Sequence, residues 1–341
     1  MSTLPRSVAL VALTTGGRRL AAALAAALPG GVCEPVQDGV RATLTRLWTR
    51  YEGIVCVMAA GIVVRAVAPL LADKRQDPCV VVMDERGQWA VSLVGGHLGG
   101  GNELARCLAR LTGGQAVITT ASDVLGRTAL DVWLAANGLT PEPPELVTWA
   151  SGLLVNRGFL QVACDVPGPL PDDFQAVEAA TAEVAVTWRA ASALPPAGRR
   201  LLLRPPVLAV GVGCNRGTPV EEFDAALAEL FAEAGLAIAA VRCLASIDLK
   251  RDEPGLRAFA ARHQWPLVFF DKDRLNTVPV AASSPAVRQA TGARGVAEPA
   301  ACLAAGTGQL LVRKRKWQNV TLAVAKAAYT LSEPVPAIPT T

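Results

Sequence analysis

Short apolar runs rich in β-branched residues alternate with alanine- and leucine-rich stretches through most of the chain. In the first part these runs predict strands at 7–13, 53–58, 79–84, 89–93 and 116–119. Leu20, Leu24 and Leu28 recur every four residues, which predicts a helix with one apolar face that packs on a sheet. Strands that alternate with helices are typical of βαβ units, so the predicted fold class is α/β with parallel sheets.

Two changes of composition suggest domain boundaries. Pro and Glu dominate residues 140–144, and Pro195 and Pro196 precede a new apolar strand at 207–212. The stretch between these two places shows a helical pattern at 149–156 and predicts strands at 160–164 and 184–188. After it, further strands are predicted at 237–241 and 267–270, followed by a hairpin around 310–324. We therefore expect an N-terminal α/β domain over residues 1–140, a small α+β insert over 141–204, and a C-terminal α/β domain over 205–341.

The composition mainly excludes several classes of protein. The 341 residues are 51% hydrophobic, which excludes a disordered chain, and the net charge of +4 with only 5% aromatic residues argues against a nucleic-acid binder. A small-molecule partner is expected instead. Eight scattered cysteines without a Cys-x-x-Cys pair, and only two histidines, predict buried thiols in a cytoplasmic protein and no metal site.

One stretch, residues 53–72, is apolar over the length that spans a bilayer. Arg65 interrupts it, and its Ile- and Val-rich start followed by alanine and glycine favours a buried strand, a turn and a helix. We expect no membrane segment.

A glycine-rich loop carries the densest chemical signal. Five of the seven residues from Gly95 to Gly101 are glycines, and they lie between a predicted strand and a predicted helix, where backbone amides can bind an anion. Asn102 is a candidate N-cap. His97, in the middle of the loop, is a candidate general base beside amides that could stabilise an oxyanion. The alternative is a tight turn with a structural histidine.

A second loop, residues 211–217, also joins a strand to a helix, and Thr218, Pro219 and Glu221 after it predict a capping box. Its third glycine lies one residue too late for the dinucleotide fingerprint, so a nicotinamide cofactor is disfavoured. Here too a packed turn is the alternative. A third place, Thr119 and Thr120, follows a strand and so lies at the carboxyl end of a sheet, where open α/β folds bind ligands.

Several motifs together resemble a known family. Residues 58–65, 77–84, 96–105 and 118–123 resemble the N-terminal domain of the cobalamin biosynthesis G family, the cobalt-precorrin-5A hydrolases, and residues 211–218, 245–250, 252–256 and 296–301 resemble its second domain. The resemblance covers nearly the whole chain except the central insert. Gly95 and Gly101 slightly alter the expected glycine loop.

The resemblance implies a specific reaction. In the oxygen-independent route to cobalamin, such an enzyme uses water to open the δ-lactone of cobalt-precorrin-5A and expels the methylated meso carbon between rings A and D as acetaldehyde, giving cobalt-precorrin-5B. It implies no separate cofactor, since cobalt arrives within the corrinoid substrate. Whether the product passes directly to a neighbouring pathway enzyme is left open.

The candidate residues named above can be given expected roles in this reaction. We expect His97 as the base, and Glu103, Asp123 and Glu298 as the acidic groups for further proton transfers. Arg65, Lys74, Arg75 and Arg216 are expected to pair with substrate carboxylates. The full set of expected substrate-binding residues is Arg65, Gly96, Gly99, Gly100, Asn102, Thr119, Thr120, Gly213, Cys214, Arg216 and Gly217.

Two other functions compete with this interpretation. The family's C-terminal domain also resembles stand-alone proteins of the oxygen-dependent route, so a non-catalytic corrinoid carrier is the main alternative. A nucleotide-dependent oxidoreductase built on residues 211–217 is the other.

Overall fold

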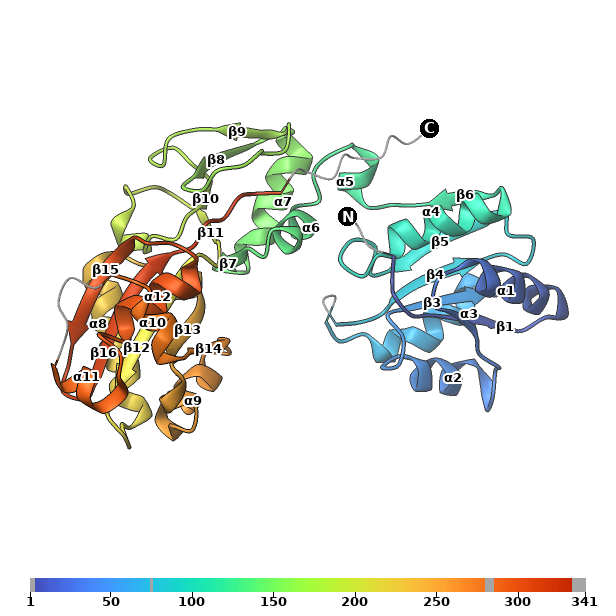
Figure 1. The fold of residues 1–341 in the computed structure, drawn as a ribbon. Helices are drawn as coiled ribbons and strands as arrows, with labels where there is room; N and C mark the ends of the chain where they lie inside the picture. The colour runs from blue at the N-terminus through green and yellow to red at the C-terminus, as the bar shows by residue number, and fades with distance from the viewer. Residues whose placement is uncertain (1–3, 74–75, 280–284, 333–341) are drawn as a thin grey trace. The chain divides into compact units, whose positions relative to one another are not determined.

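The chain folds into two compact units, shown in a computed structural model that describes residues 4–73, 76–279 and 285–332 (Figure 1). Unit 1 contains the residues up to Ala136 together with Ser151–Gly158, and unit 2 contains Asn137–Ala150 and the residues from Phe159 onward. Three sheets follow one another along the chain, the first in unit 1 and the other two in unit 2. Within the described ranges, no helix is long and apolar enough to cross a bilayer.

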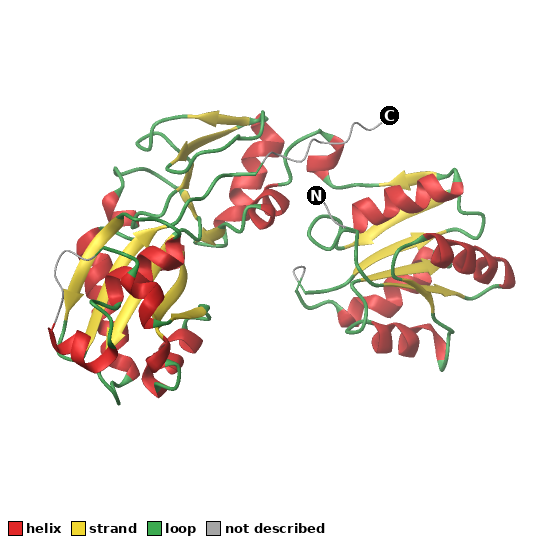
Figure 2. Ribbon diagram, viewed as in Figure 1, coloured by secondary structure: helices red, strands yellow, loops and turns green. Residues whose placement is uncertain are grey.

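In Figure 2 the strands of unit 1 are drawn in yellow and its helices in red. The sheet of unit 1 has six strands in the order β2-β1-β3-β4-β5-β6. Their bounds are β1 (Val8–Ala12), β2 (Gly31–Cys33), β3 (Gly53–Val57), β4 (Cys79–Met83), β5 (Trp89–Val94) and β6 (Gln115–Val117). β2, β1, β3 and β4 run parallel, whereas β5 is antiparallel to β4 and β6 is parallel to β5. The carboxyl ends of β1, β3 and β4 therefore lie at one edge of the sheet, and those of β5 and β6 lie at the opposite edge.

Helices cover both faces of this sheet because alternate strand residues point to opposite sides. α1 (Thr15–Ala27) and α4 (Gly101–Thr112) pack on one face, and α2 (Gly39–Leu47) and α3 (Ala60–Val67) pack on the other. The predicted leucine face of the first helix is confirmed, since Leu24 and Leu28 are buried in the core and Leu20 packs against it. The apolar stretch 53–72 forms β3, α3 and η1 (Ala68–Leu70), as predicted. Two short helices follow β6, α5 (Ala121–Val124) and α6 (Leu130–Ala136).

The central sheet, in unit 2, has the order β7-β11-β10-β8-β9. Its elements are β7 (Thr140–Glu142), α7 (Leu146–Arg157), β8 (Leu160–Cys164), β9 (Phe174–Ala176), β10 (Val184–Val186), η2 (Ala191–Ala193) and β11 (Leu201–Arg204). All strands are parallel except β7. The fully buried guanidinium of Arg204 donates to the Glu142 carboxylate at 2.7 Å and to the Thr187 carbonyl at 3.2 Å, so its charge is compensated.

The C-terminal sheet has the order β14-β13-β12-β16-β15. Its strands are β12 (Leu208–Cys214), β13 (Val241–Ile247), β14 (Leu267–Phe270), β15 (Leu310–Lys316) and β16 (Val320–Lys326), and the last two form the predicted hairpin. α8 (Val220–Ala234) and α9 (Pro254–Arg262) pack on one face, and the alanine-rich α12 (Ala297–Ala305) packs on the other. The remaining helices are η3 (Ile238–Ala240), η4 (Asp248–Lys250), α10 (Lys272–Asn276) and α11 (Pro285–Thr291). The α/β class with mostly parallel sheets is thus confirmed.

Three local predictions were wrong. Residues 238–240 form η3 instead of a strand, because the alanines there lack the β-branched side chains that favour extended backbone. The capping box does not form, since the Thr218 hydroxyl donates to the Asn215 carbonyl at 2.9 Å and the helix begins after Pro219. Asn102 is not an N-cap, because Gly100 holds that position with a left-handed φ of 77°.

The contact between α12 and β12 yields a stability prediction. A Cβ on Gly211 would lie 1.8 Å from the Ala297 carbonyl oxygen, so helix and strand must separate in Gly211→Ala. We expect this variant to lose about 1–3 kcal/mol of unfolding free energy in urea. The matched control is Gly213→Ala on the same strand, where the nearest atom would be 3.7 Å away. Equal stability of the two variants would contradict this packing.

Candidate active site

The glycine loop that carries His97 joins β5 to α4. Gly95 has a φ of 66°, and a Cβ there would lie 2.9 Å from the Cys79 backbone, so the close turn requires glycine. The amides of Gly100, Gly101 and Asn102 donate to the carbonyls of His97, Gly95 and Gly96 at 2.9–3.0 Å. These three amides are therefore not free to bind an anion, and the ionisable side chain of the loop is that of His97.

Both ring nitrogens of His97 face carboxylates. Nε2 lies 2.9 Å from Oδ2 of Asp123, and Nδ1 lies 3.4 Å from Oδ1 of Asp131. The hydrogen bonds to Asp123 and Asp131 outweigh burial and raise the pKa of His97 to about 9. At neutral pH His97 is therefore a cation, which can donate a proton, and it acts as a base only after losing that proton.

Asp123 is the centre of the cluster. Its Oδ2 also accepts from Asn102 Nδ2 at 2.9 Å, and its Oδ1 accepts from Arg106 at 2.7 Å. Burial alone would raise the pKa of Asp123, but the hydrogen bonds from His97 and Arg106 lower it below its usual value. Arg106 also pairs with Glu103 at 2.6 Å, and Asn102 donates to the Thr120 hydroxyl at 3.2 Å. The structure thus brings together five predicted residues, His97, Asn102, Glu103, Thr120 and Asp123.

Ser122 gives the cluster a superficial likeness to a nucleophilic triad. Its Oγ lies 2.9 Å from His97 Nε2, and Asp131 faces the other ring nitrogen. In a triad the imidazole must be neutral to accept the serine proton. Here the ionised Asp123 shares Nε2 and the ring is protonated, so this arrangement does not activate Ser122 at neutral pH.

Three members of the cluster were not among the predicted site residues. Arg106 could have been identified from the sequence, because it follows Asn102 by four residues and Glu103 by three and so lies on the same face of the helix. Ser122 lies within a motif that was recognised. Asp131 could not have been identified in this way, because no periodic pattern in the short α6 indicates that this residue contacts the glycine loop.

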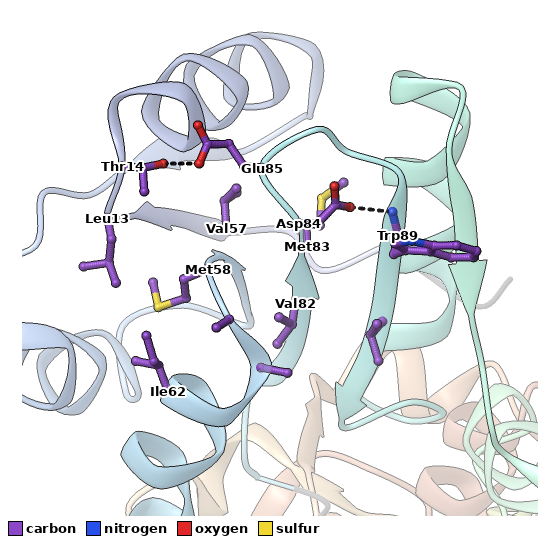
Figure 3. Close-up of a pocket in the computed structure, with 13 residues that line it drawn as sticks. Leu13, Thr14, Val57, Met58, Ile62, Val82, Met83, Asp84, Glu85 and Trp89 are labelled. Atoms are coloured by element: carbon purple, nitrogen blue, oxygen red, sulfur yellow. Dashed lines mark hydrogen bonds between the residues drawn. The ribbon is translucent and has the colours of Figure 1, made fainter.

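Arg65 lies on α3, apart from this cluster. α3 starts at the carboxyl end of β3, and the guanidinium of Arg65 donates back to the Gly61 carbonyl at 2.9 Å. Lys74 and Arg75, also expected to bind carboxylates, lie outside the described residues. A pocket of about 600 Å³ opens beside the start of α3, at the edge of the sheet opposite to the loop that carries His97 (Figure 3).

This pocket differs chemically from the cluster. Its walls are mainly apolar and include Met58, Ile62 and Val82, and its charged lining residues are Asp84 and Glu85 (Figure 3). Asp84 accepts from the backbone of Trp89 at 2.7 Å, and Glu85 accepts from Thr14 at 2.8 Å. Among the described residues, the lining carries two carboxylates and no cation, so it repels a ligand that carries many carboxylates.

The predicted residues of the second loop lie in unit 2. The Gly217 amide donates to the buried Glu253 at 2.7 Å, and Arg216 is an exposed partner of Asp252 at 3.5 Å. Burial raises the pKa of Cys214 to about 11, so it is a neutral thiol at pH 7. Gly213 is on β12.

Glu298 and Thr119 complete the predicted set. Glu298 lies in the first turn of α12, is buried, and accepts from the Lys314 backbone at 3.0 Å, so it joins that helix to β15. Thr119 is exposed after β6. Glu298 thus belongs to unit 2, whereas the other predicted acids belong to unit 1.

The ion pairs of His97 generate a prediction about pH and stability. Because the pKa rises from 6.5 to about 9 on folding, the stabilisation is complete below pH 6.5 and is lost as the pH rises through 9. We expect the stability difference between the wild type and His97→Gln to be about 1–3 kcal/mol larger at pH 6 than at pH 10. Urea unfolding across this range measures it, and a constant difference would show that the cation is not held as described.

Comparison with known proteins identifies the family. The model "Cobalamin synthesis G N-terminal" matches residues 42–123, and "Cobalamin synthesis G C-terminus" matches residues 208–325. The chain is 36% identical to the cobalt-precorrin-5A hydrolase of Priestia megaterium over 308 residues, covering 85% of this chain and 82% of that protein. It is 34% identical to the cobalt-precorrin-5A hydrolase of Salmonella typhimurium over 349 residues, covering 95% and 98%.

A shorter relative matches part of the chain. Protein CobE of Sinorhizobium is 36% identical over 129 residues, which cover 37% of this chain and 84% of that protein. The two hydrolases, in contrast, match along most of their own length and most of this chain. The chain belongs to the cobalamin synthesis G family.

Proposed function

We propose that this protein is a cobalt-precorrin-5A hydrolase of anaerobic cobalamin biosynthesis. The observation that carries the proposal is the identity of 34–36% to two hydrolases over 82–98% of their length. The carrier alternative is not favoured, because the similarity to CobE covers only 37% of the chain. The NAD alternative lacks a dinucleotide fingerprint in residues 211–217.

The reaction needs water, proton transfers and no further cofactor. Water adds to the lactone carbonyl, and the ring C–O bond breaks to leave a carboxylate and a hydroxyl on the carbon to be expelled. When that hydroxyl loses its proton, its oxygen forms the aldehyde carbonyl as the carbon–carbon bond breaks. The electron pair of this bond stays with the macrocycle, which takes up a proton, and acetaldehyde leaves.

We assign the first proton donation to His97. Its charged form, held by Asp123 and Asp131, is suited to protonate the departing lactone oxygen. The neutral ring left behind can then accept the hydroxyl proton. This base role differs from the one expected from the sequence, in which His97 activates the water. Glu103, Asp123 and Glu298 remain the candidates for the other transfers, with Glu103 and Asp123 supported by their contacts in the same cluster.

Substrate binding requires both cations and apolar surface. Arg65 is exposed but lies at the sheet edge opposite to His97, and the exposed Arg216 belongs to unit 2, so their pairing with substrate carboxylates stays a proposal. Next to His97 and Asp123 in the chain, Leu98, Val124 and Leu125 are 41%, 56% and 52% exposed. Because exposed apolar side chains beside a charged cluster favour a ligand that is flat and apolar with charged substituents, we propose that they contact the macrocycle. The remaining predicted contacts of the glycine loops, and transfer of the product to a neighbouring pathway enzyme, stay proposals.

The function is tested by anaerobic incubation with enzymatically prepared cobalt-precorrin-5A. Acetaldehyde is trapped as a hydrazone, and the macrocycle is followed by mass spectrometry. We expect one acetaldehyde per macrocycle converted, over many turnovers. Tight binding of the macrocycle without acetaldehyde would instead support the carrier.

The role of His97 is tested with His97→Gln. Loss of the acid–base group should lower kcat by about 10²–10⁴-fold while binding of the macrocycle changes little. The control is His263→Gln, which removes the other histidine of the chain, in unit 2. Unchanged turnover in His97→Gln would remove His97 from the mechanism.

The apolar contact is tested with Leu125→Ser. If the Leu125 side chain contacts the macrocycle only in binding, its replacement should raise KM several-fold at unchanged kcat. Leu111→Ser, which removes a leucine of similar exposure at the end of α4, serves as the control and should leave both constants unchanged. An effect of equal size in both variants would contradict a specific contact at Leu125.

A further inference from the structure

Five side chains in unit 1 form an unbroken row of alternating charges. Along this row, Glu103 pairs with Arg106 at 2.6 Å, Arg106 with Asp123 at 2.7 Å, Asp123 with His97 at 2.9 Å, and His97 with Asp131 at 3.4 Å. The members come from α4, α5, the glycine loop and α6, so the row joins four segments of the chain. We call it the charge row.

The charge row is shielded from solvent. The side chains of Glu103, Arg106 and Asp123 are each 16% exposed, and those of His97 and Asp131 are 21% and 25% exposed. Water and salt screen such pairs less than surface pairs. A change of charge at one member therefore changes the electrostatic potential at its neighbours.

Arg106 lies between two carboxylates in this row. One nitrogen of its guanidinium binds Oε1 of Glu103, and another binds Oδ1 of Asp123. With Oδ1 held in this way, Oδ2 of Asp123 faces the His97 ring and also accepts from Asn102. Arg106 thereby fixes the rotation of the carboxylate that orients the imidazole.

We propose that Arg106 is a positioning residue of the hydrolase, which acts through Asp123 to orient His97 and to moderate how tightly His97 holds its proton. The proposal rests on the proposed function. Arg106 itself does not contact the reacting atoms. Its positive charge opposes the attraction that Glu103 and Asp123 exert on the proton of His97.

The groups that face His97 determine the sign of the expected effects. Asp123 from α5 and Asp131 from α6 are in contact with it, and Glu103 and Arg106 from α4 are linked to it through Asp123. The backbone and Cβ of Cys79 on β4 lie under the glycine loop. Burial raises the pKa of Cys79 to about 12, so this thiol is neutral in the relevant range. Removing Arg106 leaves the carboxylates less compensated, whereas removing the charge of Asp123 withdraws the main partner of His97.

The proton on His97 can be followed directly by NMR. Because the chain has only two histidines, His263→Gln assigns both imidazole signals. We expect Arg106→Gln to move the titration of His97 to higher pH and Asp123→Asn to move it to lower pH. Arg106→Lys keeps the charge and should leave the titration near that of the wild type. Arg110→Gln, an exposed arginine one turn further along α4, is the matched control and should have no effect.

The kinetic measurements separate positioning from stability. Arg106→Gln should lower kcat by about 10–100-fold with little change in KM, because the imidazole is no longer held in its productive orientation. Its alkaline limb in the kcat–pH profile should follow the NMR titration upward. A lysine cannot bridge both carboxylates as a guanidinium does, so Arg106→Lys should restore only part of kcat.

Two results would overturn the proposal. If Arg106→Gln lowers the thermal midpoint and the active fraction but leaves the His97 titration and the alkaline limb unmoved, Arg106 is only structural. If Arg106→Gln and Asp123→Asn shift the titration in the same direction, the row does not act as described. Absence of acetaldehyde from the wild type would refute the proposed function instead, and the NMR titration would still report on the charge row.

Discussion

The charged cluster of unit 1 depends on one carboxylate, that of Asp123, and on the charge it keeps inside the protein. Both of its oxygens accept hydrogen bonds, from His97 and Asn102 on one side and from Arg106 on the other. A buried carboxylate without such partners would take up a proton. With them it stays ionised, and because it stays ionised, the neighbouring imidazole stays protonated. The acid proposed for lactone opening is thus produced by the environment of Asp123.

The direction of one strand places these groups together. β5 runs antiparallel to β4, so its carboxyl end, which starts the glycine loop, lies at the same edge as the end of its parallel neighbour β6. The glycine loop and the segment of Thr120 and Asp123 therefore meet. The ends of β1, β3 and β4 form the opposite edge, with the apolar pocket and its two carboxylates. One sheet thereby separates the edge with the charged cluster from the edge with the apolar, acidic pocket.

Much of the fold could be predicted from the sequence, and less of the site. The strands β8 and β14 were predicted to the residue because short apolar runs mark them directly. Apolar runs do not encode strand direction, however, so the separation of Arg65 from His97 could not be predicted. The pairing of His97 with Asp131 depends on how the short α6 packs, and it leaves no periodic signal. The charged state of His97 follows from these contacts, which explains why the sequence suggested only a base.

Attack of water at the carbonyl carbon of the lactone can be followed by running the proposed reaction in H₂¹⁸O under anaerobic conditions. Mass spectrometry of the macrocycle then shows where the oxygen of water has gone. We expect one ¹⁸O atom in a carboxylate of the product macrocycle for each acetaldehyde released. A product macrocycle without ¹⁸O would contradict it, because water would then have attacked the expelled carbon instead of the lactone carbonyl.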